Sequence, residues 1–449
     1  MSLEVLVALC KKRGFIFQSS ALYGGLQGFF DYGPLGVELK NNIKKIWWED
    51  IVLKKENVFG LDSATILNPK VLEQSGHKDT FTDPLKDCLD CKSRFRTDEI
   101  KNDECPKCKS KKLSEERKFN LMMKTNLGPL ESENGSEGFL RPETAQGIFI
   151  NFKNICDTFS PKLPFGIAQT GKAYRNEITP RNFTFRTREF EQMEMEYFVL
   201  PDQADKTMDE IVAERINWWK KLGIEVQAKE QTQEELAHYA KKTVDLIFKF
   251  PHSDEELEGI CNRTDFDLGS HTKAQAEFDI QAKVKENKTS TQKLAYLNEE
   301  KKWIVPFIIE TSAGLDRAVL AALQSAYNEE QLEEGKSRIV LKFKKEIAPI
   351  KAAIIPLVKN NEEIQKLARK TLNFLKENKV MQVVLENTGN IGKAYRKHDE
   401  IGTPYCITID HESIESSLES GIESVTVRNR DTMKQERVKL DKLLEYLGY

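Results

Sequence analysis

The segment that most constrains this chain runs from Ala173 to Phe198 and reads AYRNEITPRNFTFRTREFEQMEMEYF. Two stretches of alternating apolar and polar residues flank a polar Thr-Pro-Arg-Asn loop, and this pattern predicts an antiparallel β-hairpin. Side chains alternate between the two faces of a strand, so Arg175 and Glu177 are expected on one face of the first strand. The same alternation groups three residues of the second strand, namely Arg186, Arg188 and Phe190.

The expected hairpin carries three kinds of group that together suit one ligand. A guanidinium suits phosphate, an aromatic ring suits a purine, and a carboxylate can accept a hydrogen bond from an exocyclic amine. ATP combines all three parts. The same residues would also fit a surface hairpin of mixed charge, so the pattern alone leaves both interpretations open.

Half of the eight cysteines form two CxxC pairs that are separated by thirteen residues. These are Cys88, Cys91, Cys105 and Cys108. Two such pairs can surround one tetrahedral Zn²⁺ with four thiolates. Disulfides are the alternative, and they fit poorly with a chain that shows no export signal. The scattered Cys10, Cys156, Cys261 and Cys406 have apolar neighbours and are expected in the core.

Length and composition bound the remaining possibilities. A chain of 449 residues should hold two or three domains with ample core. The net charge of −3 does not exclude a nucleic-acid partner, because binding needs a local basic face rather than a basic total. No apolar run is long enough to span a bilayer, and the N-terminal stretch does not read as a secretory signal. We expect a cytoplasmic protein with no membrane partner.

Three stretches resemble motifs of class II aminoacyl-tRNA synthetases. The order aromatic-Arg-x-Glu, loop, Arg-x-x-x-Phe in the hairpin is similar to motif 2, and FIIETSAGLDR at 307–317 resembles motif 3. GFLRPETAQG at 138–147, together with EFEQMEMEYF, is similar to the homodimeric glycyl-tRNA synthetases. The likeness extends from about Gly14 to the C-terminus.

The resemblance implies an α+β fold with an antiparallel class II sheet flanked by helices, a zinc-ribbon-like insertion and a C-terminal α/β anticodon-binding domain. The implied ranges are a catalytic domain at 1–335 with insertions at 84–118 and about 202–250, motif 1 at about 36–69, motif 2 at about 173–198, motif 3 at about 307–325, and an anticodon-binding domain at 345–449. Motif 1 builds the dimer interface in that family. The residues alone favour a plain amphipathic helix over 35–55 that packs on a sheet.

Strands alternating with helices predict a separate mixed sheet after the change of pattern near residues 334–336. The expected strands cover 351–358, 380–387, 404–409 and 424–429, and the expected helices cover 361–378, 391–402 and 432–447. Asn390 to Lys397 occupies the place of an arginine cluster in the glycine enzymes. Lys393 and Ala394 depart from that pattern, and a solvated charged helix is the alternative.

The resemblance also implies how ATP would be held while the carboxylate of glycine attacks its α-phosphorus. That carboxylate is ionised at neutral pH, so catalysis rests on positioning and charge neutralisation. Arg175 would grip the α-phosphate, Arg317 the γ-phosphate, and Glu177 the adenine amine, while Phe190 and Arg317 would sandwich the ring. The implied catalytic residues are Arg175, Arg317 and Glu310. The implied ATP-binding set is Arg175, Asn176, Glu177, Phe185, Arg186, Phe190, Glu256, Leu257, Gly314, Leu315, Asp316 and Arg317, with Glu256 and Glu310 as ligands of Mg²⁺.

Glycine has no side chain to grasp, so the site must exclude a methyl group and anchor the ammonium with acceptors. The residues that match the family's glycine site are Glu143, Gln192, Glu194, Glu310, Ser312, Gly314 and Arg96. As isolated residues, each would more often be structural. The sequence names no base for the later transfer to tRNA; His77 lies nearest the catalytic region, and a structural role suits it better.

The expected activity is therefore ATP-dependent attachment of glycine to tRNA(Gly) by a homodimer with ATP, Mg²⁺ and Zn²⁺. One alternative is a class II synthetase for serine, threonine, proline or histidine. A catalytically inactive RNA-binding paralogue is a second alternative, although it should have lost Arg175 or Arg317. A zinc-ribbon nucleic-acid module would explain only the four cysteines.

Overall fold

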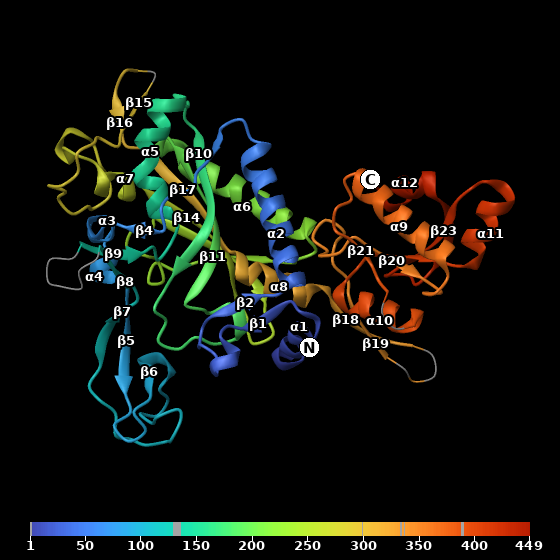
Figure 1. Ribbon diagram of the computed structural model, residues 1–449. Helices are drawn as coiled ribbons and strands as arrows, with labels where there is room; N and C mark the ends of the chain where they lie inside the picture. Colours follow the sequence, from blue (N-terminus) through green and yellow to red (C-terminus); the bar gives the residue numbers. More distant parts are fainter. Residues whose placement is uncertain (1, 129–135, 299, 333–334, 336, 388–389) are drawn as a thin grey trace.

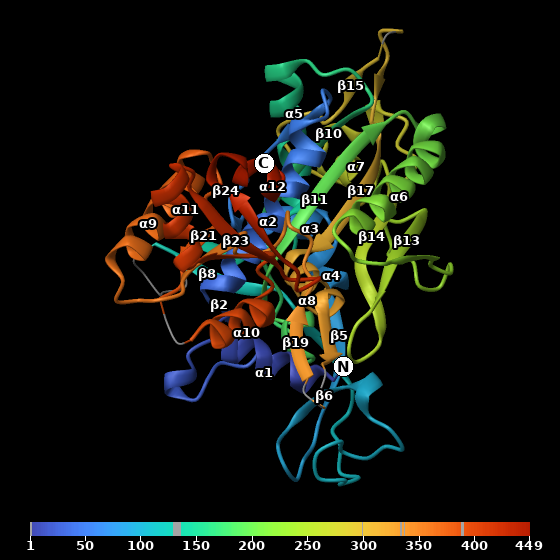
Figure 2. The ribbon, with the colours of Figure 1, turned by 90° about the vertical axis from the view of Figure 1, so that its right-hand side faces the viewer.

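A seven-stranded sheet forms the centre of the larger body in the computed structural model, which describes residues 2–128, 136–298, 300–332, 335, 337–387 and 390–449 (Figure 1). The strands, in spatial order, are β12 (Gln227–Glu230), β13 (Lys242–Lys249), β14 (Asp254–Thr264), β17 (Phe307–Gly314), β11 (Glu189–Val199), β10 (Phe165–Tyr174) and β3 (Val58–Gly60). Neighbouring strands are antiparallel except β10 and β3, which are parallel. Figure 2 shows β11, β17, β14 and β13 side by side. The antiparallel sheet expected from the resemblance is confirmed.

The alternation in β11 gives the sheet one apolar and one partly polar face. Met193, Met195 and Val199 belong to the larger apolar core, which includes residues of three helices. These helices are α2 (Pro34–Trp48), α6 (Ala204–Lys221) and α8 (Leu315–Ala326). On the opposite face, α5 (Ala145–Phe159) and α7 (Phe266–His271) cover one end of the sheet, where Phe152 packs against Phe198. Glu194 and Glu196 share this second face.

The hairpin of β10 and β11 is present, but its strands are placed differently from the expectation. Residues 175–188 form a loop with a 3₁₀ turn at Phe183–Phe185, so the alternation rule was wrong for the four arginine and glutamate positions of the loop. Pro180 lacks a backbone donor, and Asn182 and Phe183 have positive φ angles, which end the pleat. Arg188 donates to the carbonyl oxygens of Glu177 and Gln27.

Smaller elements complete the larger body. They are α1 (Leu3–Arg13), β1 (Ile16–Gln18), β2 (Phe30–Tyr32), β4 (Ile66–Leu67), α3 (Pro69–Gln74), α4 (His77–Thr80), β8 (Met123–Leu127), β9 (Ser136–Leu140), β15 (Tyr296–Leu297) and β16 (Trp303–Ile304). The helix expected over 35–55 is present as α2 with a π-helical turn at Glu49–Leu53. None of the described helices is both long and apolar enough to cross a membrane.

The two expected insertions differ in the structure. The first forms a small sheet of β5 (Thr82–Asp87), β6 (Arg94–Arg96) and β7 (Arg117–Asn120), which protrudes from the body (Figure 1). The second is not separate: residues 202–250 supply α6, β12 and β13, which are parts of the main sheet and its core. The polar composition of 226–241 concealed the apolar alternation of β13, in which Val244, Leu246 and Phe248 are buried.

The C-terminal body has a five-stranded sheet of its own. Its order is β21 (Val383–Leu385), β20 (Ala352–Pro356), β22 (Tyr405–Ile409), β23 (Ser424–Asn429) and β24 (Gln435–Lys439), with β20 parallel to both neighbours. The helices are α9 (Glu362–Glu377), α10 (Ile391–Ile401), α11 (His411–Ser420) and α12 (Leu443–Leu447). The helix expected over 432–447 is confirmed only at its end, as α12, because the earlier part of this stretch contains β24, and α11 was not foreseen.

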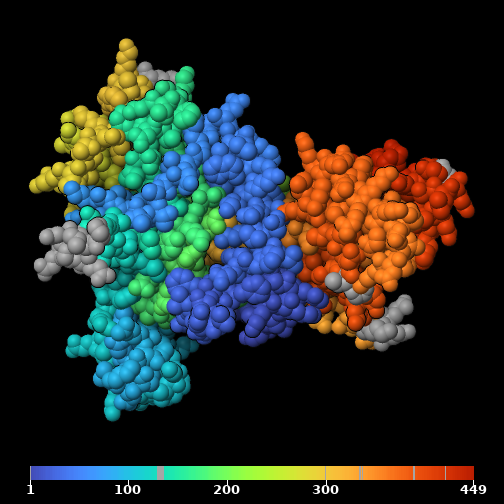
Figure 3. Space-filling view, viewed as in Figure 1, coloured from blue at the N-terminus to red at the C-terminus, as the bar shows by residue number. Residues whose placement is uncertain are grey.

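A hairpin of β18 (Tyr327–Gln331) and β19 (Ser337–Leu341) connects the two bodies. The change of pattern expected near 334–336 falls mostly outside the described residues, which omit 333–334 and 336. Figure 3 shows the C-terminal body as a distinct mass beside the larger one. Asp399 of α10 joins them: its carboxylate accepts from Arg338 of β19 at 2.9 Å and from Arg428 of β23 at 2.8 Å, with all three side chains buried.

Replacing Asp399 should destabilise this junction. Asp399→Ala leaves the buried guanidinium of Arg428 without its carboxylate and leaves Arg338 with Glu330 alone, so we expect the free energy of unfolding to fall by about 3–5 kcal/mol in a denaturant titration. Glu363→Ala is the control, because Glu363 and Lys366 form an exposed pair on α9 that should contribute about 0.5 kcal/mol or less. Equal effects of the two substitutions would contradict a structural role for Asp399.

Candidate active site and metal centre

A cavity of about 180 Å³ lies where the loop after β10 meets the start of α8. Arg175 and Arg317 both line it, although they are far apart in the sequence. Its other lining residues from the expected ATP and glycine sets are Glu177, Phe185, Arg186, Phe190, Gln192, Glu256, Ser312, Gly314 and Asp316. The strand register explains this convergence. The pairing of β11 with β17 ends at Gln192 opposite Gly314. The loop that precedes β11 and the helix that follows β17 therefore lie at the same edge of the sheet.

Each of the two central arginines lies over an aromatic ring. The guanidinium carbon of Arg175 is 5.2 Å from the ring centre of Phe190, and that of Arg317 is 4.2 Å from that of Phe185. Arg175 donates to the carbonyl oxygen of Pro142 at 3.1 Å, and Arg317 donates to that of Glu256 at 2.8 Å. In this structure Arg317 therefore lies on Phe185, whereas the expected stack pairs it with Phe190.

Three polar atoms of residues that line this cavity remain available for a ligand. The Oε2 atom of Glu177, the Oγ1 atom of Thr184 and the Nη1 atom of Arg186 are buried and have no hydrogen-bond partner among the described residues. A buried acceptor and a buried cationic donor without partners are costly, which points to a ligand that supplies both a donor and an anion. An adenine amine and a phosphate would satisfy them.

Three members of the expected ATP set do not line the cavity. The side chains of Leu257 and Leu315 lie in the main apolar core, so only their backbone could meet a ligand. The backbone N–H of Asn176 donates to the carbonyl oxygen of Leu121 at 2.7 Å. These residues belong to the expected set because they lie next to ligand-binding residues in the family motifs. Leu257 and Leu315 are apolar because their side chains pack in the core.

Deeper on the same face of the sheet lies a cluster of buried carboxylates. Carboxylate oxygens of Glu194, Glu196 and Glu310 all lie within 4.8 Å of one another. Glu194 accepts from the hydroxyl of Thr144 and from Gln192, whose amide also donates to Ser312 at 3.1 Å.

Glu143, which is expected at the glycine site, lies in a related network. It accepts from Gln146 at 3.0 Å and lies 3.4 Å from His77 Nε2. His77 in turn contacts Ser75 through Nδ1 at 2.8 Å, which suits the structural role expected for it.

One buried cation faces this cluster. Arg263 donates to Glu310 at 3.0 Å and to both oxygens of Asp267, and it lies over the ring of Tyr239. Burial and the neighbouring carboxylates of Glu310 and Glu143 raise the pKa of Glu194 to about 8. Burial also raises the pKa of Glu196 well above its usual value, and neither of its oxygens has a partner among the described residues. The cluster has more acids than cations and suits a cationic ligand.

Sequence reasoning missed four residues of this network, namely Thr144, Gln146, Glu196 and Arg263. A signal for Glu196 was available, because it follows Glu194 by two positions in a strand and so shares its face. Arg263 has no recognisable role in the sequence. Its importance depends on the pairing of β14 with β17, which the sequence does not display.

The two expected Mg²⁺ ligands belong to different parts of the site. Cys261 of β14 is opposite Glu310 of β17, and Gly259 is opposite Ser312. A Cβ atom on Gly259 would lie 3.5 Å from Oε1 of Glu256, so the Glu256 carboxylate reaches back along β14 toward Glu310. Shared binding of one Mg²⁺ by the pair stays a prediction. Glu256 lines the ATP cavity, whereas Glu310 belongs to the carboxylate cluster.

Arg96, the remaining expected glycine contact, lies on the protruding insertion. It forms ion pairs with Asp83 at 3.0 Å and Asp98 at 3.1 Å. Burial would lower its pKa, but Asp98, Asp83 and also Glu177 raise it. The structure thus places Arg96 near the ATP cavity and not in the carboxylate cluster.

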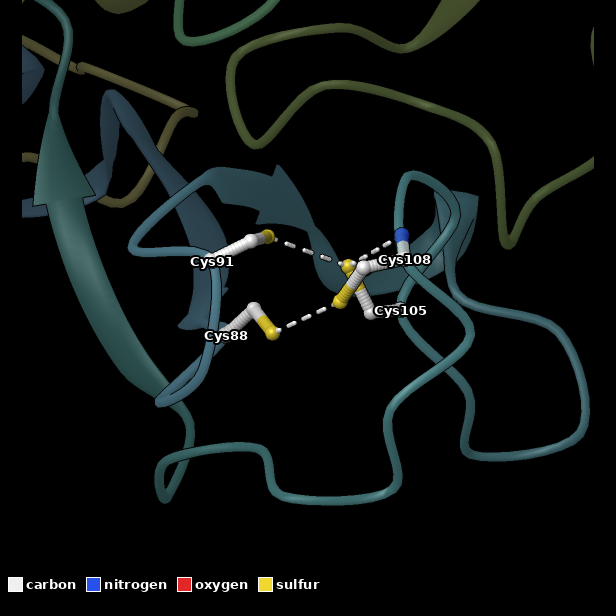
Figure 4. A group of neighbouring side chains, drawn as sticks. All are labelled: Cys88, Cys91, Cys105 and Cys108. Atoms are coloured by element: carbon white, nitrogen blue, oxygen red, sulfur yellow. Dashed lines mark hydrogen bonds between the residues drawn. The ribbon is translucent and has the colours of Figure 1, made fainter.

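The four expected zinc ligands come together at the tip of the insertion (Figure 4). Their sulfur atoms are 3.5 Å apart for Cys88 and Cys108 and 3.7 Å apart for Cys91 and Cys105. Four sulfurs at 2.3 Å from a tetrahedral Zn²⁺ would be separated by about 3.8 Å, so the spacing fits the ion. Hydrogen bonds from Ser93 lower the pKa of the Cys91 thiol to about 6, which favours the thiolate that a metal needs.

Both CxxC turns repeat one backbone design. The N–H of Lys92 donates to the carbonyl oxygen of Cys88, and that of Lys109 donates to that of Cys105, each at 2.9 Å. Lys92 and Lys109 both have positive φ angles, at 58° and 61°.

Comparison with known proteins agrees with this architecture. Residues 129–327 match the family model of the tRNA synthetase class II core domain (G, H, P, S and T), and residues 351–448 match that of the anticodon binding domain. Fold and site together define a class II tRNA synthetase.

Curated relatives narrow the assignment. The chain is 49% identical to a glycine–tRNA ligase of Thermus thermophilus, an alignment that covers 99% of this chain and 98% of the relative. It is 46% identical to the Deinococcus radiodurans enzyme of the same name, with the same coverage. It is 47% identical to the enzyme of that name from Borreliella burgdorferi, covering 99% of this chain and 96% of the relative. The chain belongs to the glycine–tRNA ligase family.

Removal of metal should unfold the insertion alone. We expect chelation, or Cys91→Ser, to open residues 84–118 to protease while the two larger bodies stay resistant, because three side chains of this stretch are buried and two of them are cysteines. Mass spectrometry of the fragments locates the cleavage, and elemental analysis gives the zinc content. Cys156→Ser is the control and should retain the metal. Unchanged protease resistance after chelation would argue against a structural ion.

Proposed function

We propose that this protein attaches glycine to tRNA(Gly) in two steps, ATP-dependent formation of glycyl-adenylate followed by transfer to the terminal adenosine of the tRNA. The observation that carries the proposal is the convergence of Arg175 and Arg317 on one cavity next to a cluster of buried carboxylates. Membership of the glycine–tRNA ligase family supports it.

In the first step, positioned charges do most of the work. Arg175 stabilises the charge that develops on the α-phosphate, Arg317 holds the γ-phosphate, and Arg186 orients the phosphates. The free oxygen of Glu177 accepts from the adenine amine. Mg²⁺ bound with ATP would neutralise phosphate charge, and Glu256 offers the oxygen ligand at this cavity.

Glycine binds through its ammonium at the carboxylate end of the site. Glu143, Glu194 and Glu310 supply acceptors, while Ser312 and Gln192 connect this end to the ATP cavity. Selection against larger amino acids would be steric, since glycine offers no side chain to bind and the site must exclude a methyl group. Arg96 of the insertion forms ion pairs with Asp83 and Asp98, and its expected contact with glycine stays a prediction.

The wider assembly follows the family. We assign the catalytic domain to 1–335 and tRNA anticodon binding to 345–449. The insertion at 84–118 would hold Zn²⁺ through its four cysteines. We further propose a cytoplasmic homodimer formed through the motif 1 region at 36–69.

Exchange of labelled pyrophosphate into ATP, measured with each of the twenty amino acids, tests the activity. We expect exchange with glycine alone. Exchange driven by alanine or serine would instead favour a synthetase of another specificity. No exchange with any amino acid, while tRNA still binds, would favour an inactive RNA-binding paralogue.

Arg175→Ala should abolish glycine-dependent exchange without unfolding the protein, because it removes the cation opposite the reacting phosphate. A loss of about 10²–10³-fold in kcat is expected. Arg94→Ala is the matched control, since Arg94 is exposed on the insertion and pairs only with Asp87 among the described residues. Exchange at the wild-type rate in Arg175→Ala would refute the role of Arg175.

The raised pKa of Glu194 predicts the pH dependence of glycine binding. Below about pH 8 the free protein holds a proton on Glu194, and the bound ammonium favours the carboxylate. Glycine should therefore bind more tightly as pH rises from about 6 to 8, with proton release at pH 7. Calorimetry in buffers of different ionisation enthalpy measures the protons released. In Glu194→Gln, glycine affinity should no longer rise with pH, and glycine binding should release no proton at this site.

A further inference from the structure

A buried ionic network lies directly behind the ATP cavity, on the side of α2. The carboxylate of Asp316 accepts from the hydroxyl of Tyr32 at 2.5 Å and from the backbone N–H of Glu191 at 2.6 Å. Lys40 of α2 lies 3.4 Å from Asp316 and 3.0 Å from Glu191. Lys44, one turn further along α2, binds Glu191 at 2.8 Å.

The network is attached to both walls of the cavity. Glu191 stands between Phe190 and Gln192, which both line the cavity, and strand alternation turns the Glu191 side chain to the opposite face. Asp316 immediately precedes Arg317 in the first turn of α8. Phe190, Gln192 and Arg317 are thus each connected to α2 through a neighbouring residue in the chain, Glu191 or Asp316.

Asp316 also continues the hydrogen-bond ladder where the strands end. β11 and β17 are paired as far as Gln192 and Gly314, and beyond this point β17 turns into α8. The Oδ2 atom of Asp316 takes the place of a strand carbonyl and receives the N–H of Glu191. This bond sets the distance between the Phe190 side and the Arg317 side of the cavity.

Burial makes the network rigid. Asp316 is 6% exposed and Lys40 is 9% exposed. Burial alone would raise the pKa of Glu191, but Lys40 and Lys44 lower it, as expected for a paired carboxylate. Both oxygens of Asp316 have protein partners although the residue lines the cavity, so its bonds to the protein suit a positioning role, and its expected contact with ATP stays a prediction.

We propose that Asp316 and Lys40 are positioning residues that hold Arg317 and Phe190 at the spacing that ATP requires. The inference rests on the proposed function, since it concerns the ATP of the same reaction.

Steady-state exchange kinetics of Asp316→Ala test this. We expect KM for ATP to rise about 10- to 100-fold, with KM for glycine nearly unchanged, because the carboxylate cluster does not touch the network. Asp316→Asn keeps an oxygen that can accept from the Glu191 N–H, so its KM for ATP should rise less than that of Asp316→Ala. Tyr32→Phe removes a single hydrogen bond without a change of packing, so it provides a mild variant if Asp316→Ala does not fold.

Lys40→Met should show the same selective rise in KM for ATP. The double variant Lys40→Met/Asp316→Asn removes two opposite charges together. Its fold increase in KM for ATP should be smaller than the product of the increases in the two single variants. Lys45→Met is the control on the same helix, because Lys45 is exposed and its nearest carboxylate, Glu49, is 3.8 Å away.

Two results separate the possible failures. An active wild-type enzyme whose folded Asp316→Ala variant keeps its KM for ATP would overturn this inference alone, as would an equal rise in KM for glycine. A wild-type protein without glycine-dependent exchange would overturn the proposed function.

Discussion

The pairing of β11 with β17 is the constraint on which the rest of the site depends. It places Glu194 opposite Ser312 and Glu196 opposite Glu310, so residues over a hundred positions apart share one face of the sheet. The paired region ends at Gln192 and Gly314, next to the loop that carries Arg175 and the helix that carries Arg317. Because a slip by one residue would turn every carboxylate into the apolar core, substrate selection and folding depend on the same hydrogen bonds.

The site has more buried carboxyl groups than buried cations, and burial raises the pKa values of Glu194 and Glu196 so that they favour the protonated form in the free protein. Arg263 pairs with Glu310 and Asp267, while Glu196 has no partner within the described part of the chain. Leaving such groups unpaired costs stability, and a cation that enters the pocket recovers part of that cost. A substrate with an ammonium group and almost no apolar surface can bind on this basis, since charge replaces the contacts that its missing side chain would have made.

Much of this could be foreseen from the sequence, and particular residues explain what could not. The EFEQMEMEYF alternation indicates β11, and the two CxxC pairs indicate the cysteine cluster. The loop at 175–188 was misjudged because positive φ angles at Asn182 and Phe183 leave no periodic signal. The resemblance treats Glu256 and Glu310 as one pair, and only the structure shows that Glu256 lines the ATP cavity while Glu310 belongs to the carboxylate cluster. β24 was mistaken for helix because only Val438 of its five residues is buried, so its alternation is faint.

The insertion that protrudes from the catalytic body has a consequence for the protein in the cell. Of residues 84–118, only Leu85, Cys88 and Cys105 are buried, and none of them belongs to an apolar core cluster. With so little hydrophobic burial, the folded structure of the insertion would depend on the Zn²⁺ ion that its four thiolates bind. Its shape would then follow the local supply of zinc, while the sheet behind it kept its own stability.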